Sequence, residues 1–118
     1  MKEEFEGRML RIHFTEADKY EGRPLHEAIV AKCSQLGLAG ATVYRGMEGF
    51  GASARIHHAR SLSISKNAPI MVSVVDTEER IQSLIPHLDR MIAGGLVASS
   101  KVHVIHYSRT KPATSNVS

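Results

Sequence analysis

The sequence of 118 residues is poor in aromatic side chains and in cysteine. It has no tryptophan, and aromatic residues make up only 5% of the chain, which disfavours a nucleic-acid binder built on base stacking. The single cysteine, Cys33, rules out an internal disulfide framework and a cysteine-cluster metal site. No apolar run approaches the ~20 residues that a membrane-spanning helix requires. These absences leave an ordinary soluble globular domain.

Charge and length set the next limits. The net charge of +3 is too small to indicate nucleic-acid binding by itself. Residues 1–6 are charged and do not resemble a signal peptide, so we expect a cytoplasmic protein. A chain of this length builds one core. We therefore expect a single domain over residues 1–107 and a polar, disordered tail over residues 108–118.

Periodic apolar residues predict four strands and two helices. The strands are expected at 9–14, 41–45, 69–75 and 101–107, and the helices at 24–36 and 77–92. We expect Pro24 at the first position of the first helix, Asp76 as the cap of the second, and a kink at Pro86. This order predicts an α+β fold, a ferredoxin-like βαββαβ sandwich whose antiparallel sheet carries both helices on one face.

The sheet face without helices is expected to be apolar. Its predicted residues are Met9, Thr42, Met71, Val75 and Ile105. Such a face is usually covered by other subunits, which would enlarge the core of a small chain. The alternative is a set of ordinary, scattered surface hydrophobic residues.

A long connection over roughly residues 46–68 is the first candidate functional segment, because connections of this length are usually functional or disordered. Its Gly49-Phe50-Gly51 motif provides either a backbone that approaches a ligand closely or a simple turn anchored by Phe50. The basic residues in and beside it are Arg45, Arg55, Arg60 and Lys66. They outnumber the one acid, Glu48, which favours an anionic partner such as a phosphate, and a solvated basic loop is the alternative.

Small residues at positions 94–101 form the second candidate segment, between the second helix and the last strand. A turn of this kind offers backbone N–H groups to an anion, and Lys101 adds a positive charge. The alternative is a helix stop followed by a tight turn.

No residue set predicts catalysis or metal binding. Cys33 falls on the apolar side of the first helix, and no nucleophile is paired with a base. His57 and His58 would point apart in an extended segment, which makes a poor metal site. The strand histidines are His13, His103 and His106. We expect them to be satisfied within the sheet, with a shared proton or ligand site as the alternative.

Separated motifs together resemble a known family. Gly37-x-x-Gly40-x-Thr42-Val43 followed by Gly49-Phe50-Gly51 resembles the nitrogen-regulatory PII signalling proteins, with one extra residue between the two parts. Residues 95–101 resemble the shorter phosphate-binding loop of that family. Residues 8–107 as a whole, and residues 40–61 above all, are similar to a widespread family of uncharacterised PII-like proteins.

The resemblance implies a homotrimer with inward-facing sheets and a nucleotide in each cleft between subunits. It implies that Lys101 pairs with phosphate, and that the base of the long connection lines the cleft. The connection itself would contact a regulated partner, such as a membrane transporter or a metabolic enzyme. The candidate nucleotide-binding residues are Arg45, Gly49, Phe50, Gly51, Arg55, Gly95 and Lys101.

Departures from the PII pattern narrow the expected ligand. Ala98-Ser99-Ser100 stands where PII proteins have Gly-Asp-Gly, so side chains hinder the approach of a triphosphate. Ala52-Ser53-Ala54 replaces the segment with the glutamine that serves metal and oxo-acid sensing. No tyrosine lies between Arg45 and Lys66 to match the modified tyrosine of PII proteins. We expect a monophosphate or another small adenine nucleotide.

The sequence therefore predicts a non-enzymatic, PII-like trimeric signalling protein that acts on a partner protein through its long connection. Two other functions stay open, a metal-responsive trimer like the CutA proteins and an enzyme on the same scaffold. Stabilisation by copper or zinc would indicate the first of these. Slow turnover of a bound nucleotide would indicate the second.

Overall fold

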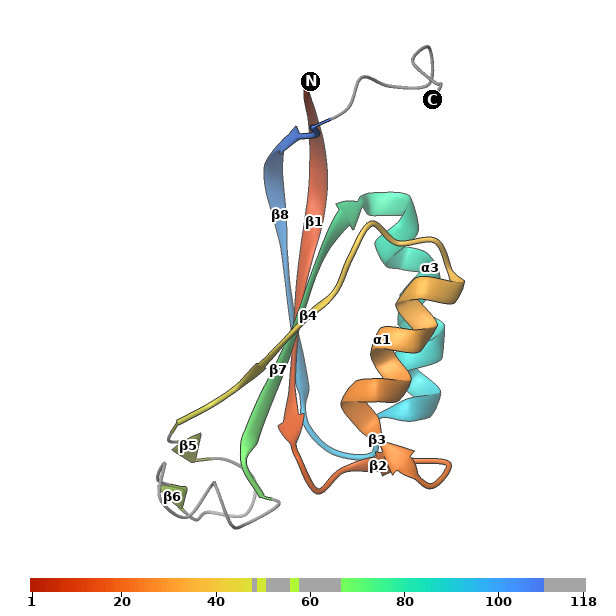
Figure 1. Ribbon diagram of the computed structural model, residues 1–118. Helices are drawn as coiled ribbons and strands as arrows, with labels where there is room; N and C mark the ends of the chain where they lie inside the picture. The colour runs from red at the N-terminus through yellow and green to blue at the C-terminus, as the bar shows by residue number, and fades with distance from the viewer. Residues whose placement is uncertain (48, 51–55, 58–66, 110–118) are drawn as a thin grey trace.

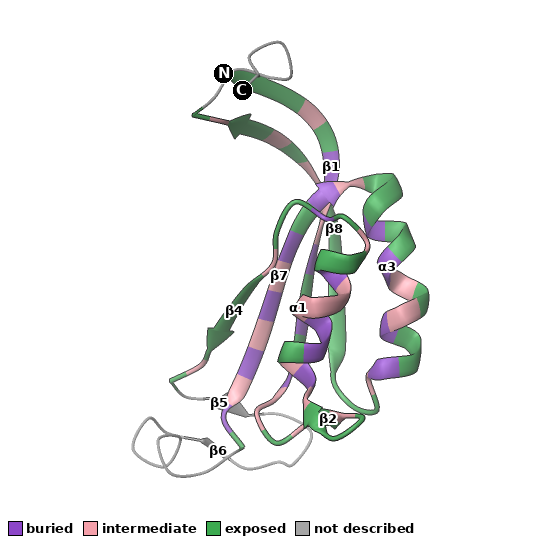
Figure 2. Ribbon diagram, turned by 45° about the vertical axis from the view of Figure 1, so that its right-hand side comes forward, coloured by how far each residue is buried: buried purple, intermediate pink, exposed green. Residues whose placement is uncertain are grey.

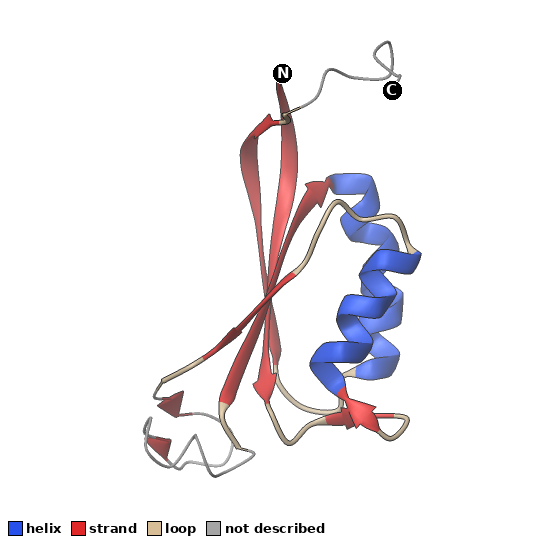
Figure 3. Cartoon of the chain, in the orientation of Figure 1, coloured by secondary structure: helices blue, strands red, loops and turns tan. Residues whose placement is uncertain are grey.

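A four-stranded antiparallel sheet forms the centre of the molecule. The computed structural model describes residues 1–47, 49–50, 56–57 and 67–109. Among them, the main sheet has the strand order β4-β7-β1-β8, and two helices cover one of its faces (Figures 1 and 3). The elements are β1 (Lys2–Thr15), α1 (Leu25–Gln35), β4 (Thr42–Arg45), β7 (Pro69–Thr77), α3 (Glu78–Met91) and β8 (Leu96–Tyr107). The predicted ferredoxin-like α+β sandwich is confirmed.

Two short hairpins accompany the main sheet. β2 (Lys19–Tyr20) pairs with β3 (Arg23–Pro24) across a two-residue turn. Both turn residues, Glu21 and Gly22, have positive φ, as the tightest hairpin turns require. β5 (Gly49–Phe50) pairs with β6 (Ile56–His57) inside the long connection.

The core lies between the sheet and the two helices. In β1, Leu10 and Ile12 are fully buried and alternate with the exposed Arg11 and His13, as the period of a strand predicts. The other fully buried large side chains are Leu25, Ile29, Val72, Val74, Ile81 and Leu84. Cys33 joins this core as predicted, and burial raises the pKa of its thiol.

The open face of the sheet carries four of the five residues predicted for it. They are Met9, Thr42, Met71 and Val75, and Tyr44 and Leu96 lie on the same face with more than half of their surface exposed. The prediction for Ile105 was wrong. The strand register places Ile105 opposite Glu4, on the same side of the sheet as the buried Leu10.

Both β1 and β8 are longer than predicted. β1 begins at Lys2 instead of Met9, and β8 begins at Leu96 instead of Lys101. Residues 96–101 of the segment predicted as a turn are strand, and their backbone pairs with β1 in one unbroken register. β7 pairs only with residues 7–15 of β1, so residues 2–6 and 103–107 form a two-stranded extension, here called the ribbon. Figure 2 shows the ribbon curving away from the helices.

The helix starts differ slightly from the prediction. Pro24 precedes α1 as its cap residue instead of occupying its first position. Thr77, not Asp76, caps α3, since the Thr77 side chain accepts a hydrogen bond from the Arg80 N–H. Asp76 is buried, and its carboxylate accepts bonds from the N–H groups of Ala39 (2.8 Å) and Thr77 (2.7 Å). Pro86 lies inside α3, and the kink stays a prediction.

The start of the chain is joined to the end of the ribbon. The Met1 ammonium group donates to the Ser108 carbonyl oxygen (2.9 Å), and the Ser108 N–H donates to the Met1 carbonyl oxygen (2.8 Å). Residues 110–118 of the predicted tail lie outside the described residues, so its disorder stays a prediction. In the described parts of the chain, no helix is long and apolar enough to cross a membrane.

Candidate functional site

The predicted site residues divide between the two edges of the sheet. Arg45 ends β4, and Gly49 and Phe50 form β5 just beyond it. Gly95 and Lys101 belong to the opposite edge, directly before and within β8. Because β7 and β1 lie between these edges, the two groups are separated by three strand spacings, about 14 Å or more. Outside the described residues are Gly51 and Arg55.

At the β4 edge, the structure fixes the point where the long connection leaves the sheet. The Gly46 N–H bonds to the Pro69 carbonyl oxygen at 2.7 Å, and a Cβ on Gly46 would lie 2.7 Å from Cγ of Pro69. Arg45 Nε donates to Glu16 Oε1 at 3.2 Å. The guanidinium group of Arg45 is therefore anchored beside the start of the connection.

At the β8 edge, Gly95 makes a close approach to β1. Its φ is +136°, and a Cβ there would lie 2.2 Å from the carbonyl oxygen of His13. Neighbouring Gly94 has open space around it. The turn into β8 therefore requires a glycine at position 95. This is a structural reason for Gly95, in addition to the role in binding that the family resemblance implies.

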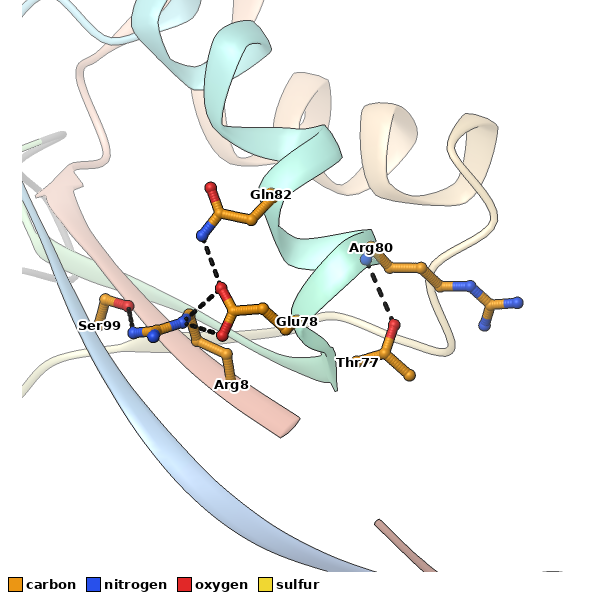
Figure 4. Close-up of polar contacts among 6 residues, drawn as sticks. All are labelled: Arg8, Thr77, Glu78, Arg80, Gln82 and Ser99. Atoms are coloured by element: carbon orange, nitrogen blue, oxygen red, sulfur yellow. Dashed lines mark hydrogen bonds and ion pairs between the residues drawn. The ribbon is translucent and has the colours of Figure 1, made fainter. Parts of the chain in front are cut away.

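Lys101 lies beside a compact polar cluster. It pairs in register with Arg8 of β1, whose Nε donates to both carboxylate oxygens of Glu78 at 2.7 and 2.9 Å (Figure 4). Arg8 Nη1 donates to Ser99 Oγ at 2.7 Å, and Gln82 Nε2 donates to Glu78 Oε2 at 2.7 Å. We call these five residues the Arg8 cluster. It joins β1, β8 and the first turns of α3.

Glu78 supplies the negative charge of the Arg8 cluster. Hydrogen bonds from Arg8 and Gln82 hold the pKa of Glu78 below its ordinary value, and the positive charge of Lys101 acts in the same direction. Glu78 is therefore a carboxylate at neutral pH. The Arg8 side chain is only 20% exposed, so its position is fixed by packing, whereas Glu78 is 47% exposed. A phosphate accepts hydrogen bonds from all three kinds of donor present here, which are a fixed guanidinium, a hydroxyl and an ammonium group.

Sequence reasoning missed Arg8 and Glu78 as members of this cluster. Arg8 precedes the predicted first strand, and Glu78 lies within the predicted second helix with no role assigned to it. Alternation carried the necessary signal, because Arg8 lies two residues before Leu10 and therefore on the helix side of β1. The partners of Arg8 on that side depend on the register of β8 and on where α3 begins, and the sequence alone does not reveal either.

The two histidines of the ribbon, His103 and His106, lie beside carboxylates. His103 on the ribbon contacts Glu4 through Nε2 (2.9 Å) and Glu6 through Nδ1 (2.5 Å), and these bonds raise its pKa. His103 is thus satisfied within the sheet, as predicted. Over the described ranges, no group of three or more His, Cys, Asp or Glu side chains is arranged to hold a metal ion. His58 lies outside these ranges.

The fold is similar to that of solved PII-like proteins. CPII from Thiomonas intermedia K12, in a structure with ADP and bicarbonate, matches with a TM-score of 0.64 and 18% identity, over 86% of this chain and 91% of CPII. GlnK of B. subtilis, in a complex with ATP, matches with a TM-score of 0.56 and 10% identity, over 82% of each chain. At these identities the likeness establishes the PII-like fold.

Sequence relatives define the family. A UPF0166 protein from Methanocaldococcus jannaschii is 33% identical over 98 residues, which cover 82% of this chain and 90% of the relative. Another, from Aquifex aeolicus, is 28% identical over 99 residues, which cover 84% and 93%. The family model DUF190, described as an uncharacterized ACR (COG1993), matches residues 7–104. The predicted relation to an uncharacterised PII-like family is confirmed, and the chain belongs to the DUF190 family.

Proposed function

We propose that the protein is a PII-like regulatory protein that binds a small adenine nucleotide between subunits. The observation that carries this proposal is the division of the candidate residues between opposite edges of one sheet. A ligand touching both Arg45 and Lys101 needs the β4 edge of one copy and the β8 edge of another. The structures of CPII with ADP and of GlnK with ATP support an adenine nucleotide as that ligand.

A homotrimer is the assembly that we propose. The open face of the sheet exposes Tyr44, Val75 and Leu96 by 52%, 37% and 58%. Covering this face with neighbouring copies would remove its apolar surface from water, which is the main driving force of subunit association. Through its long connection, the assembly would contact an unidentified regulated protein, such as a membrane transporter.

We propose binding without catalysis. The single cysteine is buried, and burial raises the pKa of its thiol, so Cys33 is a packing residue and not a nucleophile. The strand conformation of Ala98, Ser99 and Ser100 favours a mono- or diphosphate, because a paired strand does not wrap around a triphosphate as a glycine loop does.

A thermal-shift panel with AMP, ADP, ATP and cyclic AMP tests this function. A ligand at a hundredfold excess over its dissociation constant stabilises the folded protein by about 2.7 kcal/mol. We expect a shift with at least one nucleotide, loss of that shift in Lys101→Ala, and retention in the control Lys19→Ala, whose lysine lies on β2. Absence of any nucleotide shift, together with a copper or zinc shift reversed by EDTA, would instead indicate a metal-responsive protein.

A further inference from the structure

The Arg8 cluster holds a carboxylate where the proposed ligand would place a phosphate. The Glu78 carboxylate accepts hydrogen bonds from Arg8 Nε–H and from the side-chain amide of Gln82, and the positive charge of Lys101 also stabilises it. These are the same donors that would bind a phosphate oxygen. An anion supplied by the chain itself therefore satisfies the cationic site.

The two partners of the Arg8–Glu78 ion pair differ in freedom. Arg8 is mostly buried and is also tied to Ser99, so it stays in place when its carboxylate partner leaves. Glu78 is half exposed at the first turn of α3 and can turn toward water while Gln82, four residues on, remains beside it. If a phosphate replaces the Glu78 carboxylate, the Arg8 guanidinium is paired with an anion before and after the exchange. The free-energy cost of leaving a partly buried charge unpaired is thereby avoided.

We propose that Glu78 is an internal stand-in for the ligand's phosphate, and that Arg8 is a phosphate-binding residue released when the nucleotide displaces Glu78. This inference rests on the proposed nucleotide site. It adds to that site one binding residue, Arg8, and one competing residue, Glu78. The resident carboxylate lowers the affinity for every phosphate-bearing ligand and has no effect on a ligand without phosphate.

Calorimetric titration of AMP, ADP and adenosine into the Glu78→Gln variant tests the competition. Glutamine keeps the shape of the side chain and removes its charge. We expect AMP and ADP to bind about 5–10-fold more tightly than to the parent protein, as for loss of a competing charge-assisted hydrogen bond. Adenosine binding stays unchanged. The matched control is Glu79→Gln, the neighbouring exposed acid in the same turn, for which screening limits the change to less than about twofold.

A second variant tests whether Arg8 touches the phosphate. In the Glu78→Gln background, Arg8→Gln removes the proposed donor without leaving an unpaired carboxylate. We expect AMP and ADP to lose at least about tenfold in affinity relative to Glu78→Gln alone, with adenosine again unaffected. Circular dichroism and thermal melting of each variant establish that the fold is retained, and Ser99→Ala provides a milder variant that weakens the hold on Arg8.

The outcomes separate this inference from the proposed function. If the parent protein binds nucleotides and Glu78→Gln behaves like Glu79→Gln, the stand-in role is overturned and the nucleotide site remains. If only Glu78→Gln binds them, the competition is established in its strongest form. If neither protein binds AMP, ADP or adenosine, both proposals are wrong.

Discussion

The helix-covered half of the sheet and the ribbon share two strands but are held together in different ways. In the covered half, β1 has β7 on one side and β8 on the other, and its inward side chains Leu10 and Ile12 are fully buried. In the ribbon, β1 pairs with β8 alone among the described strands, and exposed polar side chains face each other across it. The same pairing of β1 with β8 thus occurs in the covered half, which apolar burial stabilises, and in the ribbon, which carries exposed charged side chains.

The difference indicates where stability and sensitivity reside. Burying a large apolar side chain contributes about 1.5–3 kcal/mol and depends little on pH. Exposed pairs such as His103 with Glu4 contribute little because water and salt screen them, but they respond to protonation. We expect the covered half to set the stability of the protein and the ribbon to set its response to pH.

The largest contrast is expected between a core and a ribbon truncation. Leu84→Ala removes a fully buried side chain of α3 and is expected to lower the free energy of unfolding by about 2–5 kcal/mol. Ile105→Ala on the ribbon, where the residue is 45% exposed, is expected to cost less than about 1 kcal/mol. Urea denaturation at one fixed protein concentration measures both. Equal costs would contradict the comparison and show that the ribbon is covered in solution.

An intermediate effect is expected at the start of β8, where the covered half closes. Gly95→Ala is expected to destabilise the protein by about 1–3 kcal/mol, because its φ of +136° and the nearby His13 carbonyl oxygen exclude a side chain. Gly94→Ala is the matched control, since its surroundings are open, and its melting temperature should stay level or rise. A similar loss at both positions would mean that the turn, not the close approach, determines stability.

The smallest effect is expected from the pH response of the ribbon. Hydrogen bonds to Glu4 and Glu6 raise the pKa of His103 above its ordinary 6.5 in the folded protein. The stabilisation is therefore complete below pH 6.5 and is lost as the pH rises through the higher folded-state pKa. Hydrogen exchange, corrected for intrinsic rates, should show ribbon amides losing protection at high pH while core amides keep theirs. In His103→Gln this difference should vanish, and its persistence would assign the pH response to another group.

Much of the covered half was predictable because its side chains alternate. The pattern of Leu10, Ile12 and Phe14 shows the strand and its buried side, and α1 and α3 follow from apolar spacing. The ribbon was not predictable in this way. The sequence indicates only a charged end of the chain at Glu3, Glu4 and Glu6. These residues are strand because they pair with β8. Cross-strand pairing is a long-range property that a local pattern does not contain.

The candidate site was predictable in its parts but not in its arrangement. Lys101 and Arg45 were identified from charge and resemblance, and the strand order then placed them on opposite edges. Ser99 was expected to hinder a ligand in an open loop. In the paired strand its hydroxyl instead accepts a hydrogen bond from Arg8. Arrangement of this kind follows from register, where a shift of one residue turns every side chain to the other face.

The paired ends of the chain offer a practical handle. Because Met1 and Ser108 bond to each other at the tip of the ribbon, a fluorophore or surface anchor attached at the N-terminus, or inserted after Ser108, would begin at one point of the molecule. That point lies at the opposite end from β5 and β6 (Figure 1). An immobilised copy would therefore hold β5 and β6 away from the surface, where the partner protein that we propose could reach them.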